Sequence, residues 1–230
     1  MSSPSSLVVA IDGPSGSGKS TVARRVAEAL GSRYLDTGAM YRALTWWLLE
    51  RGVDLSDREL VAALAKDMPL RMGTDPKEPT VHVGETDVGA AIRETRISSV
   101  VSQVAQNLGV RSELVRRQQN LIDEAGGVVV EGRDITSVVA PDAPVRILLT
   151  AREDTRLARR ARDVHGADHA TAVAATRDQV LRRDADDSTV ASFQQAADGV
   201  DVIDSSDHSI DETVATVLAL IHRRAGMAPA

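Results

Sequence analysis

The sequence predicts an α/β fold built on a parallel sheet of five strands. Five short apolar segments alternate with stretches of helical periodicity along the 230 residues, which is typical of strands joined by crossover helices. A glycine-rich stretch follows the first apolar segment, where such folds commonly place a ligand-binding loop. The length suits one domain with insertions, and the 43% hydrophobic and 26% charged residues are typical of a globular protein.

The first predicted elements are a buried strand and an amphipathic helix. Residues 7–12, LVVAID, are apolar and largely β-branched, as in a buried strand. The helix predicted over 19–30 ends at Gly31, and its apolar face comprises Val22, Val26, Ala29 and Leu30. A second strand is predicted over 33–36 and a second helix over 37–52.

The next part of the chain predicts a short helix and a small insert. Ser56 and Glu59 form a capping-box pattern at the start of a helix over 57–68. Residues 69–87 alternate apolar pieces with turn residues, which favours a small antiparallel insert. Helical patterns resume from about 90 to 125.

The second half of the chain completes the sheet. Residues 127–132 and 145–150 are apolar enough to be buried parallel strands, and a last strand is predicted over 199–206. The helices of this half are an arginine-rich one, a charged one and a C-terminal one, over 152–163, 170–187 and 209–224.

The composition argues against several classes of protein. A net charge of -6 and 2% aromatic residues argue against binding a nucleic acid polymer. No apolar run reaches the length of a membrane span, and residues 1–6, MSSPSS, are expected to be a disordered tail and not a signal peptide. The absence of cysteine excludes a disulfide framework and fits a cytoplasmic protein.

The stretch from Gly13 to Ser20 matches the P-loop pattern Gly-x-x-x-x-Gly-Lys-Ser in full. Glycines let successive backbone N–H groups wrap a phosphate, and the following helix adds its N-terminal dipole. Lys19 is expected to span the β- and γ-phosphates of ATP, and Ser20 to bind Mg²⁺. The expected ATP-binding residues are Gly13, Pro14, Ser15, Gly16, Ser17, Gly18, Lys19, Ser20 and Thr21.

The loop alone leaves the second substrate open. P-loops serve GTPases, motor ATPases and small-molecule kinases, and a glycine-rich turn without a ligand is the simplest alternative. The sequence lacks a guanine-reading Asn-Lys-x-Asp, and no Asp-x-x-Gly switch follows the third predicted strand, which disfavours a GTPase.

Two segments are candidates for a second phosphate site. Thr37 begins the second helix and Arg42 follows one turn later, so a helix N-terminus and a guanidinium would clamp an anion. Glu131 and Arg133 follow the third strand, where polar side chains face the ligand crevice of a parallel sheet. Glu131 would orient the water shell of Mg²⁺, and Arg133 would hold phosphate. The alternatives are an N-cap at Thr37 and a turn stabilised by a salt bridge.

The arginine-rich helix predicts a lid over 152–191. Its arginines share a face, and two more lie on the following helix; they are Arg152, Arg156, Arg159, Arg160, Arg182 and Arg183. Phosphoryl transfer needs positioning and charge neutralisation, which arginines supply, and closure would exclude water. The alternative is a solvated helix face.

Together, these motifs resemble the bacterial cytidylate kinase family. They are IDGPSGSGKST, YLDTGAMYRAL, SQVA…VR…RRQ, VVVEGRDI…V.PDAPV and RRDADDS, in order over about 7–220. The resemblance implies a P-loop three-layer fold with a monophosphate-binding insert and a helical lid. The implied parts are a core of 7–36, 126–151 and 192–226, a monophosphate-binding region of 37–125 that includes the insert at 69–87, and the lid. It also implies an enzyme that uses ATP and Mg²⁺ to phosphorylate CMP and dCMP. Separately, no long heptad or exposed apolar stripe in the sequence demands a dimer, so a monomer is expected.

The resemblance further implies roles for single residues. The CMP phosphate would contact Arg42 and Arg133, and the cytosine would contact Ser102, Arg111 and Asp134. The ribose region would contact Thr37, Arg183 and Asp187, and the ATP phosphates would contact Arg156 and Arg160. The expected catalytic residues are Lys19, Arg133, Arg156 and Arg160.

The sequence departs from the family pattern near the end of the lid. Val190 stands where an arginine is usual, and SFQQAADG replaces the usual Ser-Pro-Leu continuation. One phosphate contact would be lost unless Arg182 or another arginine replaces it. Two alternatives remain at this point: a P-loop kinase of another acceptor such as UMP or AMP, and a non-catalytic P-loop switch.

Overall fold

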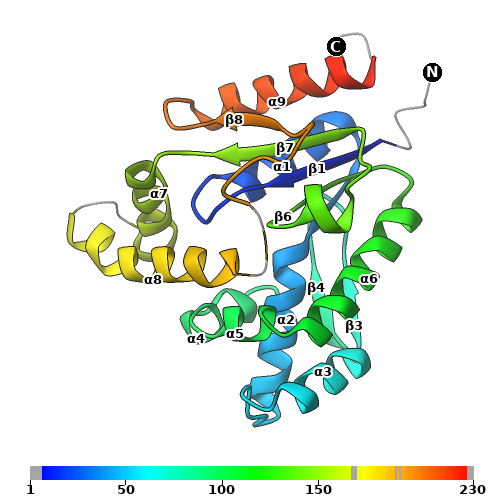
Figure 1. Cartoon of the computed structure of the whole chain (residues 1–230), viewed down its shortest axis with the longest axis vertical. Helices are drawn as coiled ribbons and strands as arrows, with labels where there is room; N and C mark the ends of the chain where they lie inside the picture. Colours follow the sequence, from blue (N-terminus) through cyan, green and yellow to red (C-terminus); the bar gives the residue numbers. More distant parts are fainter. Residues whose placement is uncertain (1–6, 167–169, 190, 192, 227–230) are drawn as a thin grey trace.

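A parallel sheet of five strands forms the centre of the protein (Figure 1). The computed structural model describes residues 7–166, 170–189, 191 and 193–226, so the tail expected over 1–6 lies outside it. The strands lie in the order β2-β6-β1-β7-β8, and every neighbouring pair is parallel. Their bounds are β1 Val8–Asp12, β2 Arg33–Asp36, β6 Val128–Gly132, β7 Val145–Thr150 and β8 Asp201–Asp204. The predicted five-stranded α/β fold is confirmed.

Helices cover both faces of the sheet and give three layers (Figure 1). On one face, Val9 and Ile11 pack into a core with α1 (Lys19–Leu30) and α9 (Ile210–Ala225). On the other face, Ala10 packs into a core with α2 (Thr37–Glu50) and α6 (Leu108–Ala125). Because both faces are covered, the three central strands β1, β6 and β7 are largely buried and apolar, which explains why the sequence revealed them.

The buried face of α1 differs in part from the prediction. Val22 and Val26 are buried as expected, but Ala29 is exposed and Leu30 is only half-buried. Ala23 and Ala27 are buried instead. The helix contacts both the sheet and α9, so its buried face is shifted toward the positions that contact both.

A second, antiparallel sheet follows α3 (Arg58–Asp67). Its strands are β3 Leu70–Met72, β4 Val81–Val83 and β5 Thr86–Asp87. The capping box predicted at Ser56 is wrong, because Asp57 is the N-cap and accepts a hydrogen bond from the N–H of Leu60 at 3.0 Å. A 3-10 turn at Ala91–Arg93 and the short helices α4 (Thr95–Ser98) and α5 (Val101–Ala105) lead to α6.

The helices α7 (Glu153–His165) and α8 (Ala170–Ser188) pack against each other beside the sheet (Figure 1). The chain enters α2 and α7 directly after β2 and β7, so both regions leave from the carboxyl ends of parallel strands. That edge is where a parallel sheet offers a ligand site. Within the described part of the chain, no helix combines the length and apolar character needed to cross a membrane.

Asp12 ties the end of β1 to the turn that follows β6. One carboxylate oxygen accepts from the N–H of Ile135 at 2.9 Å, and the other accepts from the N–H and the hydroxyl of Thr136 at 2.8 and 2.7 Å. The side chain is buried, and burial raises its pKa from an ordinary 3.8 to about 6.

This pKa predicts a pH-dependent contribution to stability. The native protein retains a proton on Asp12 where the unfolded chain has released it, so the contribution is full below about pH 4 and is lost as the pH rises through about 6. The free energy of unfolding of the wild type minus that of Asp12→Asn should fall by about 2 kcal/mol between about pH 4.5 and about pH 7, because the unfolded carboxyl is already mostly ionised at the lower value. Urea unfolding at about pH 4.5 and about pH 7 measures it, and a constant difference contradicts the prediction.

Candidate active site

The P-loop has a backbone shape that only glycine accommodates easily. Gly16 and Gly18 have φ angles of 78° and 87°, in the left-handed region. A Cβ at Gly13 would lie 2.2 Å from the carbonyl oxygen of Leu149 on the neighbouring strand. α1 begins at Lys19, so its first N–H groups and the Lys19 side chain reach the same pocket.

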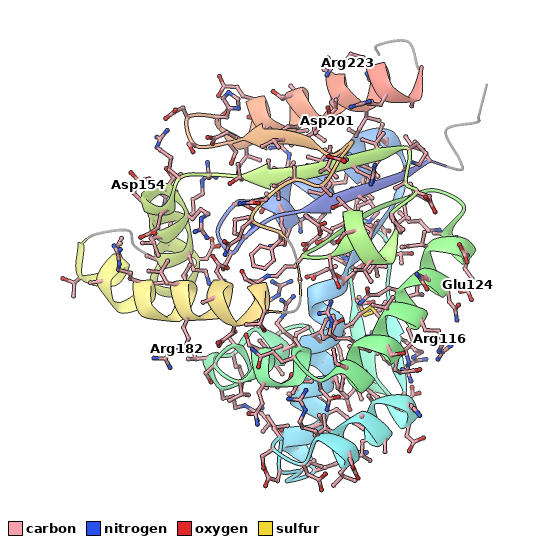
Figure 2. All side chains as sticks on the ribbon, viewed as in Figure 1. Arg116, Glu124, Asp154, Arg182, Asp201 and Arg223 are labelled. Atoms are coloured by element: carbon pink, nitrogen blue, oxygen red, sulfur yellow. The ribbon has the colours of Figure 1, made fainter. Side chains whose placement is uncertain are left out.

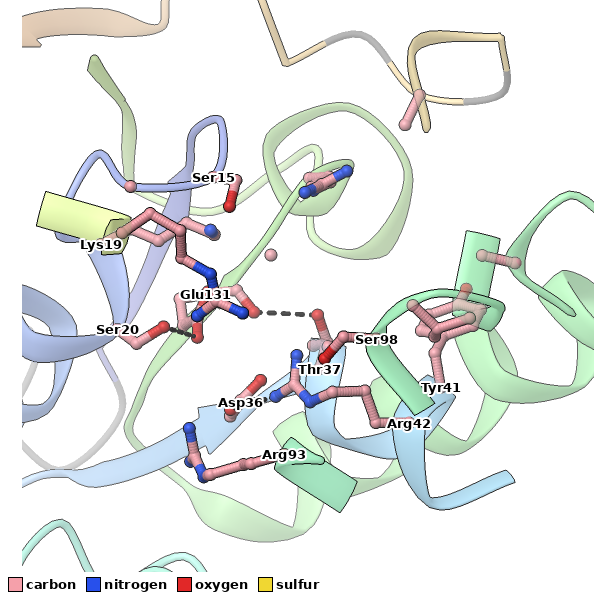
Figure 3. Close-up of a pocket in the computed structure, with 18 of the residues that line it drawn as sticks. Ser15, Lys19, Ser20, Asp36, Thr37, Tyr41, Arg42, Arg93, Ser98 and Glu131 are labelled. Carbon is pink, nitrogen blue, oxygen red and sulfur yellow. Dashed lines mark hydrogen bonds and ion pairs between the residues drawn. The ribbon is translucent and has the colours of Figure 1, made fainter. Parts of the chain in front are cut away.

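Oxygen atoms gather at the base of the loop. The Ser20 hydroxyl donates to Oε1 of Glu131 at 2.6 Å, and the Thr37 hydroxyl donates to the Glu131 carbonyl at 2.8 Å (Figure 3). Burial, with the nearby charge of Asp36, raises the pKa of Glu131. A hydroxyl and a carboxylate at this position suit a hard cation.

A second cationic site lies across the pocket. Asp36 caps α2 by accepting from the N–H of Ala39 at 2.8 Å, and it also accepts from Arg42 at 2.9 Å. Burial opposes ionisation of Asp36, but the Arg42 guanidinium and the Ala39 N–H hold its pKa below the ordinary value. Nε of Arg42 is buried and has no hydrogen-bond partner among the described residues, which suits an anionic ligand.

Sequence reasoning missed Arg93, which lines this second site. It comes from the 3-10 turn after β5 and lies close enough to help lower the pKa of Asp36. In Figure 3, Arg93 lies near Asp36 and Arg42, with Lys19 and Ser20 on the other side of the pocket. No local pattern distinguishes Arg93 from a surface arginine, because it reaches the pocket only through the fold of the insert.

Arg133 follows β6 and is held on two sides. Its guanidinium donates to Asp184 on α8 at 3.5 Å and stacks on the ring of Phe193 at 4.8 Å from the centroid. Burial lowers the pKa of Arg133 to about 10, so it remains charged at neutral pH. Phe193 belongs to the segment that departs from the family pattern, and here it supports an expected substrate arginine.

The far end of the pocket carries an ion pair between Arg111 of α6 and Asp134. Burial raises the pKa of Asp134, and the charge of Arg111 opposes that shift. Ser98 and Val101 also line the pocket, whereas Ser102 is not among its lining residues. The pair offers a hydrogen-bond donor and an acceptor side by side.

The arginines of α7 serve different purposes. Arg152 pairs with Asp207 at 2.7 Å, and Arg159 donates to the carbonyl and hydroxyl of Ser205 at 2.7 and 2.9 Å. Arg156 donates to the carbonyl of the lining residue Ser15 at 2.9 Å and to Asp184, but it is not itself among the residues that line the pocket. Arg160 lines the pocket, as Asp163 does. This side of α7 is therefore neither purely a solvated face nor purely a phosphate clamp.

Arg182, the candidate to replace the arginine expected at position 190, is not among the residues that line the pocket. It is exposed on the outer side of α8 (Figure 2). The side chains of Arg183 and Asp187, and the whole of Val190, lie outside the described residues.

These groups line one pocket of about 600 Å³, a usual size for a small-molecule site. Of the residues predicted from sequence, the lining includes Ser15, Gly16, Gly18, Lys19, Ser20, Thr21, Thr37, Arg42, Arg111, Glu131, Arg133, Asp134 and Arg160. It does not include Gly13, Pro14, Ser17, Ser102 or Arg156.

Comparison with known proteins decides the family. The family model described as cytidylate kinase matches residues 9–223. The chain belongs to the cytidylate kinase family. A cytidylate kinase of Streptomyces avermitilis is 43% identical over 95% of this chain and 94% of its own length. One from Rhodococcus opacus is 44% identical over 98% and 99%. The resemblance drawn from the motifs is thus confirmed.

Membership of the cytidylate kinase family makes the protein a phosphotransferase and disfavours a non-catalytic switch. A crystal structure of an uncharacterised protein from Eubacterium ventriosum also aligns with it, with a TM-score of 0.50 and 14% identity over 94% of this chain and 98% of that one. That likeness shows the fold alone.

Proposed function

We propose that the protein transfers the γ-phosphoryl group of ATP to CMP and dCMP. One observation carries the proposal: two cationic sites face each other across one pocket. Lys19 and the P-loop form the first, and Arg42, Arg93 and Arg133 surround the second. A switch or a motor requires only the first site, whereas a kinase of a phosphorylated acceptor requires both.

The proposed reaction is an in-line displacement. A phosphate oxygen of CMP forms a bond to the γ-phosphorus of ATP while the bond to the β–γ bridging oxygen breaks, and ADP leaves with that electron pair. The nucleophile is already anionic, so no general base is needed. Lys19 and Arg160 would neutralise the transferring group, and Arg42, Arg93 and Arg133 would hold the acceptor phosphate. Arg156, which lies outside the lining, would hold the lid helix against the P-loop.

The arrangement at the far end of the pocket supports cytosine as the base. Cytosine offers an amino donor at N4 next to the acceptors N3 and O2, and the pair of Asp134 and Arg111 complements that edge. Uracil presents an acceptor at position 4, which would face the carboxylate unpaired.

The base-reading role predicts a change in specificity. Asp134→Ala should lower the ratio of kcat/KM for CMP to that for UMP by at least about 10-fold, since a buried hydrogen bond to the correct base is lost. Steady-state kinetics with both nucleotides measures the ratio. An unchanged ratio would remove Asp134 from base recognition.

The residues at the base of the P-loop fit Mg²⁺. The oxygens of Ser20 and Glu131 lie within hydrogen-bond distance of each other beside the loop, and both are hard ligands. Ser20 would bind the ion directly and Glu131 through water. When bound, Mg²⁺ neutralises charge on the β- and γ-phosphates.

The raised pKa of Glu131 predicts how this site depends on pH. The ionised form orients the water shell, so the Mg²⁺ concentration for half-maximal rate should rise as the pH falls, beginning above the value of about 4.3 for an ordinary glutamate. Glu131→Gln should raise that concentration by about 10- to 100-fold and abolish this pH dependence. Magnesium titrations of the rate at several pH values measure both, and an equal dependence in the variant contradicts the assignment.

The proposed function is tested by release of ADP from Mg-ATP with CMP, dCMP, UMP, AMP, GMP or no acceptor. Turnover restricted to CMP and dCMP supports it. Turnover with UMP or AMP would show a kinase that does not select cytosine. Release of ADP without an acceptor would contradict transfer to a nucleoside monophosphate.

We also propose that residues 37–125 bind the monophosphate, that 152–191 act as the lid over the core, and that the enzyme is a cytoplasmic monomer. Elements from both regions line the pocket, which supports the first two assignments. Light scattering on the eluted protein tests the monomer.

A further inference from the structure

Asp184 has no role in the predictions above, yet three groups of the site converge on it. This α8 residue is 4% exposed. One carboxylate oxygen accepts from the N–H of Ser15 at 3.2 Å and from Arg133 at 3.5 Å, and the other accepts from Arg156. A single buried carboxylate therefore contacts the P-loop, the turn after β6 and α7.

Two of the three partners, Ser15 and Arg133, lie on different sides of the pocket. Ser15 lies in the P-loop, where ATP would bind, and Arg156 also donates to the Ser15 carbonyl. Arg133 lies on the side of the acceptor phosphate, and Phe193 fixes the plane of its guanidinium. Asp184 is thus shared between the groups that would receive the two nucleotides.

Burial makes this contact sensitive to the position of each partner. A buried carboxylate is costly unless its oxygens are hydrogen-bonded and its charge is balanced, so removing one arginine from it would disfavour the whole arrangement. A ligand that fixes Arg133 therefore favours the position of α8 that also holds Ser15 and Arg156, and the reverse holds for a ligand at the P-loop.

We propose that Asp184 is a positioning residue that couples the ATP site to the CMP site, so that each nucleotide tightens the binding of the other. The inference rests on the proposed function, because it takes CMP as the ligand near Arg133. Coupling between two sites is reciprocal, so the factor by which an ATP analogue tightens CMP equals the factor by which CMP tightens the analogue.

Calorimetric titration of CMP, with and without a saturating non-hydrolysable ATP analogue and Mg²⁺, measures the coupling. The wild type is expected to bind CMP about 10-fold more tightly with the analogue, within the usual range for coupled sites. Asp184→Asn should reduce that factor to below about 2, whatever its effect on the Kd for CMP alone. A merely structural role would weaken CMP binding in both titrations equally.

Asp186→Asn is the matched control, because it makes the same chemical change two residues further along α8. Among the described contacts of Asp186, only its backbone carbonyl accepts hydrogen bonds, from Gln106 and Thr189. It should keep the full coupling. Arg156→Lys changes the same contact from the side of α7, and it should also lower the coupling factor. It keeps the inference testable if Asp184→Asn fails to fold.

Three results would overturn the inference: no coupling in the wild type, full coupling in Asp184→Asn, or, where that variant does not fold, full coupling in Arg156→Lys. Failure of the proposed function looks different, because then CMP does not bind the wild type in either titration.

Discussion

Lys19→Ala is expected to lower kcat on the order of 10³-fold, the largest effect of any single side chain in the pocket. Lys19 begins α1, lines the pocket beside the glycine-rich loop, and lies near the carboxylates of Glu131 and Asp36. Its ammonium is the group of the P-loop best placed to follow the charge that moves onto the β–γ bridging oxygen. Because that charge develops in the transition state, kcat should fall much more than KM for ATP rises.

Lys77→Ala provides the control, since Lys77 is exposed in the turn between β3 and β4 and removal of its charge should leave kcat unchanged. Steady-state kinetics with CMP and ATP, together with binding of an ATP analogue, separates the two parameters. A loss smaller than about 10-fold in kcat would show that Lys19 contributes mainly to binding.

Gly16→Ala is expected to lower kcat/KM by at least about 100-fold and to destabilise the protein. The φ angle of 78° at this position strains any other residue, and an added Cβ would lie 2.4 Å from the carbonyl oxygen of Arg156. Relief requires the P-loop and the first turns of α7 to separate. That movement would disturb the hydrogen bond from Arg156 to Ser15 and displace Arg160 from the pocket.

Gly31→Ala is the control that separates backbone strain from the steric contact with α7. Gly31 ends α1 with a φ angle of 61°, but nothing lies within 4 Å of an added Cβ. It should therefore cost only the backbone strain, about 1 kcal/mol, with kcat/KM unchanged. Thermal unfolding and kinetics of both variants measure the difference. Equal losses in the two would show that α7 is not held against the P-loop.

The fold could be predicted because its signals are local and strong. Strands buried on both faces read as apolar runs, and the P-loop has fixed spacing, so the sheet and the start of α1 follow from sequence alone. Helix starts are weaker signals. Asp57 caps α3 although Ser56 begins the better pattern, because any of several short polar residues can supply the accepting oxygen.

The candidate site was only partly predictable. Lys19, Ser20, Glu131 and Arg133 stand directly after strands or at a helix start, and the carboxyl edge of a parallel sheet brings such positions together. The contributions of Arg93 and Asp184 depend on how the insert and α8 pack against the core. Those contacts join residues far apart in sequence. No local pattern marks Arg93, and the RRDADDS motif that contains Asp184 does not show what its carboxylate contacts.

The strand order also has a consequence for synthesis of the protein on the ribosome. In the sheet of the described residues, β2 pairs with β6, and β1 pairs with β6 and β7. Val128 is opposite both Val8 and Arg33, and it is synthesised long after them. At about 5–20 residues per second, the first two strands emerge on the order of ten seconds before any partner strand exists. During that interval, neither strand has a partner strand for its backbone N–H and C=O groups. The parallel sheet of this enzyme therefore cannot form until β6 has left the ribosome.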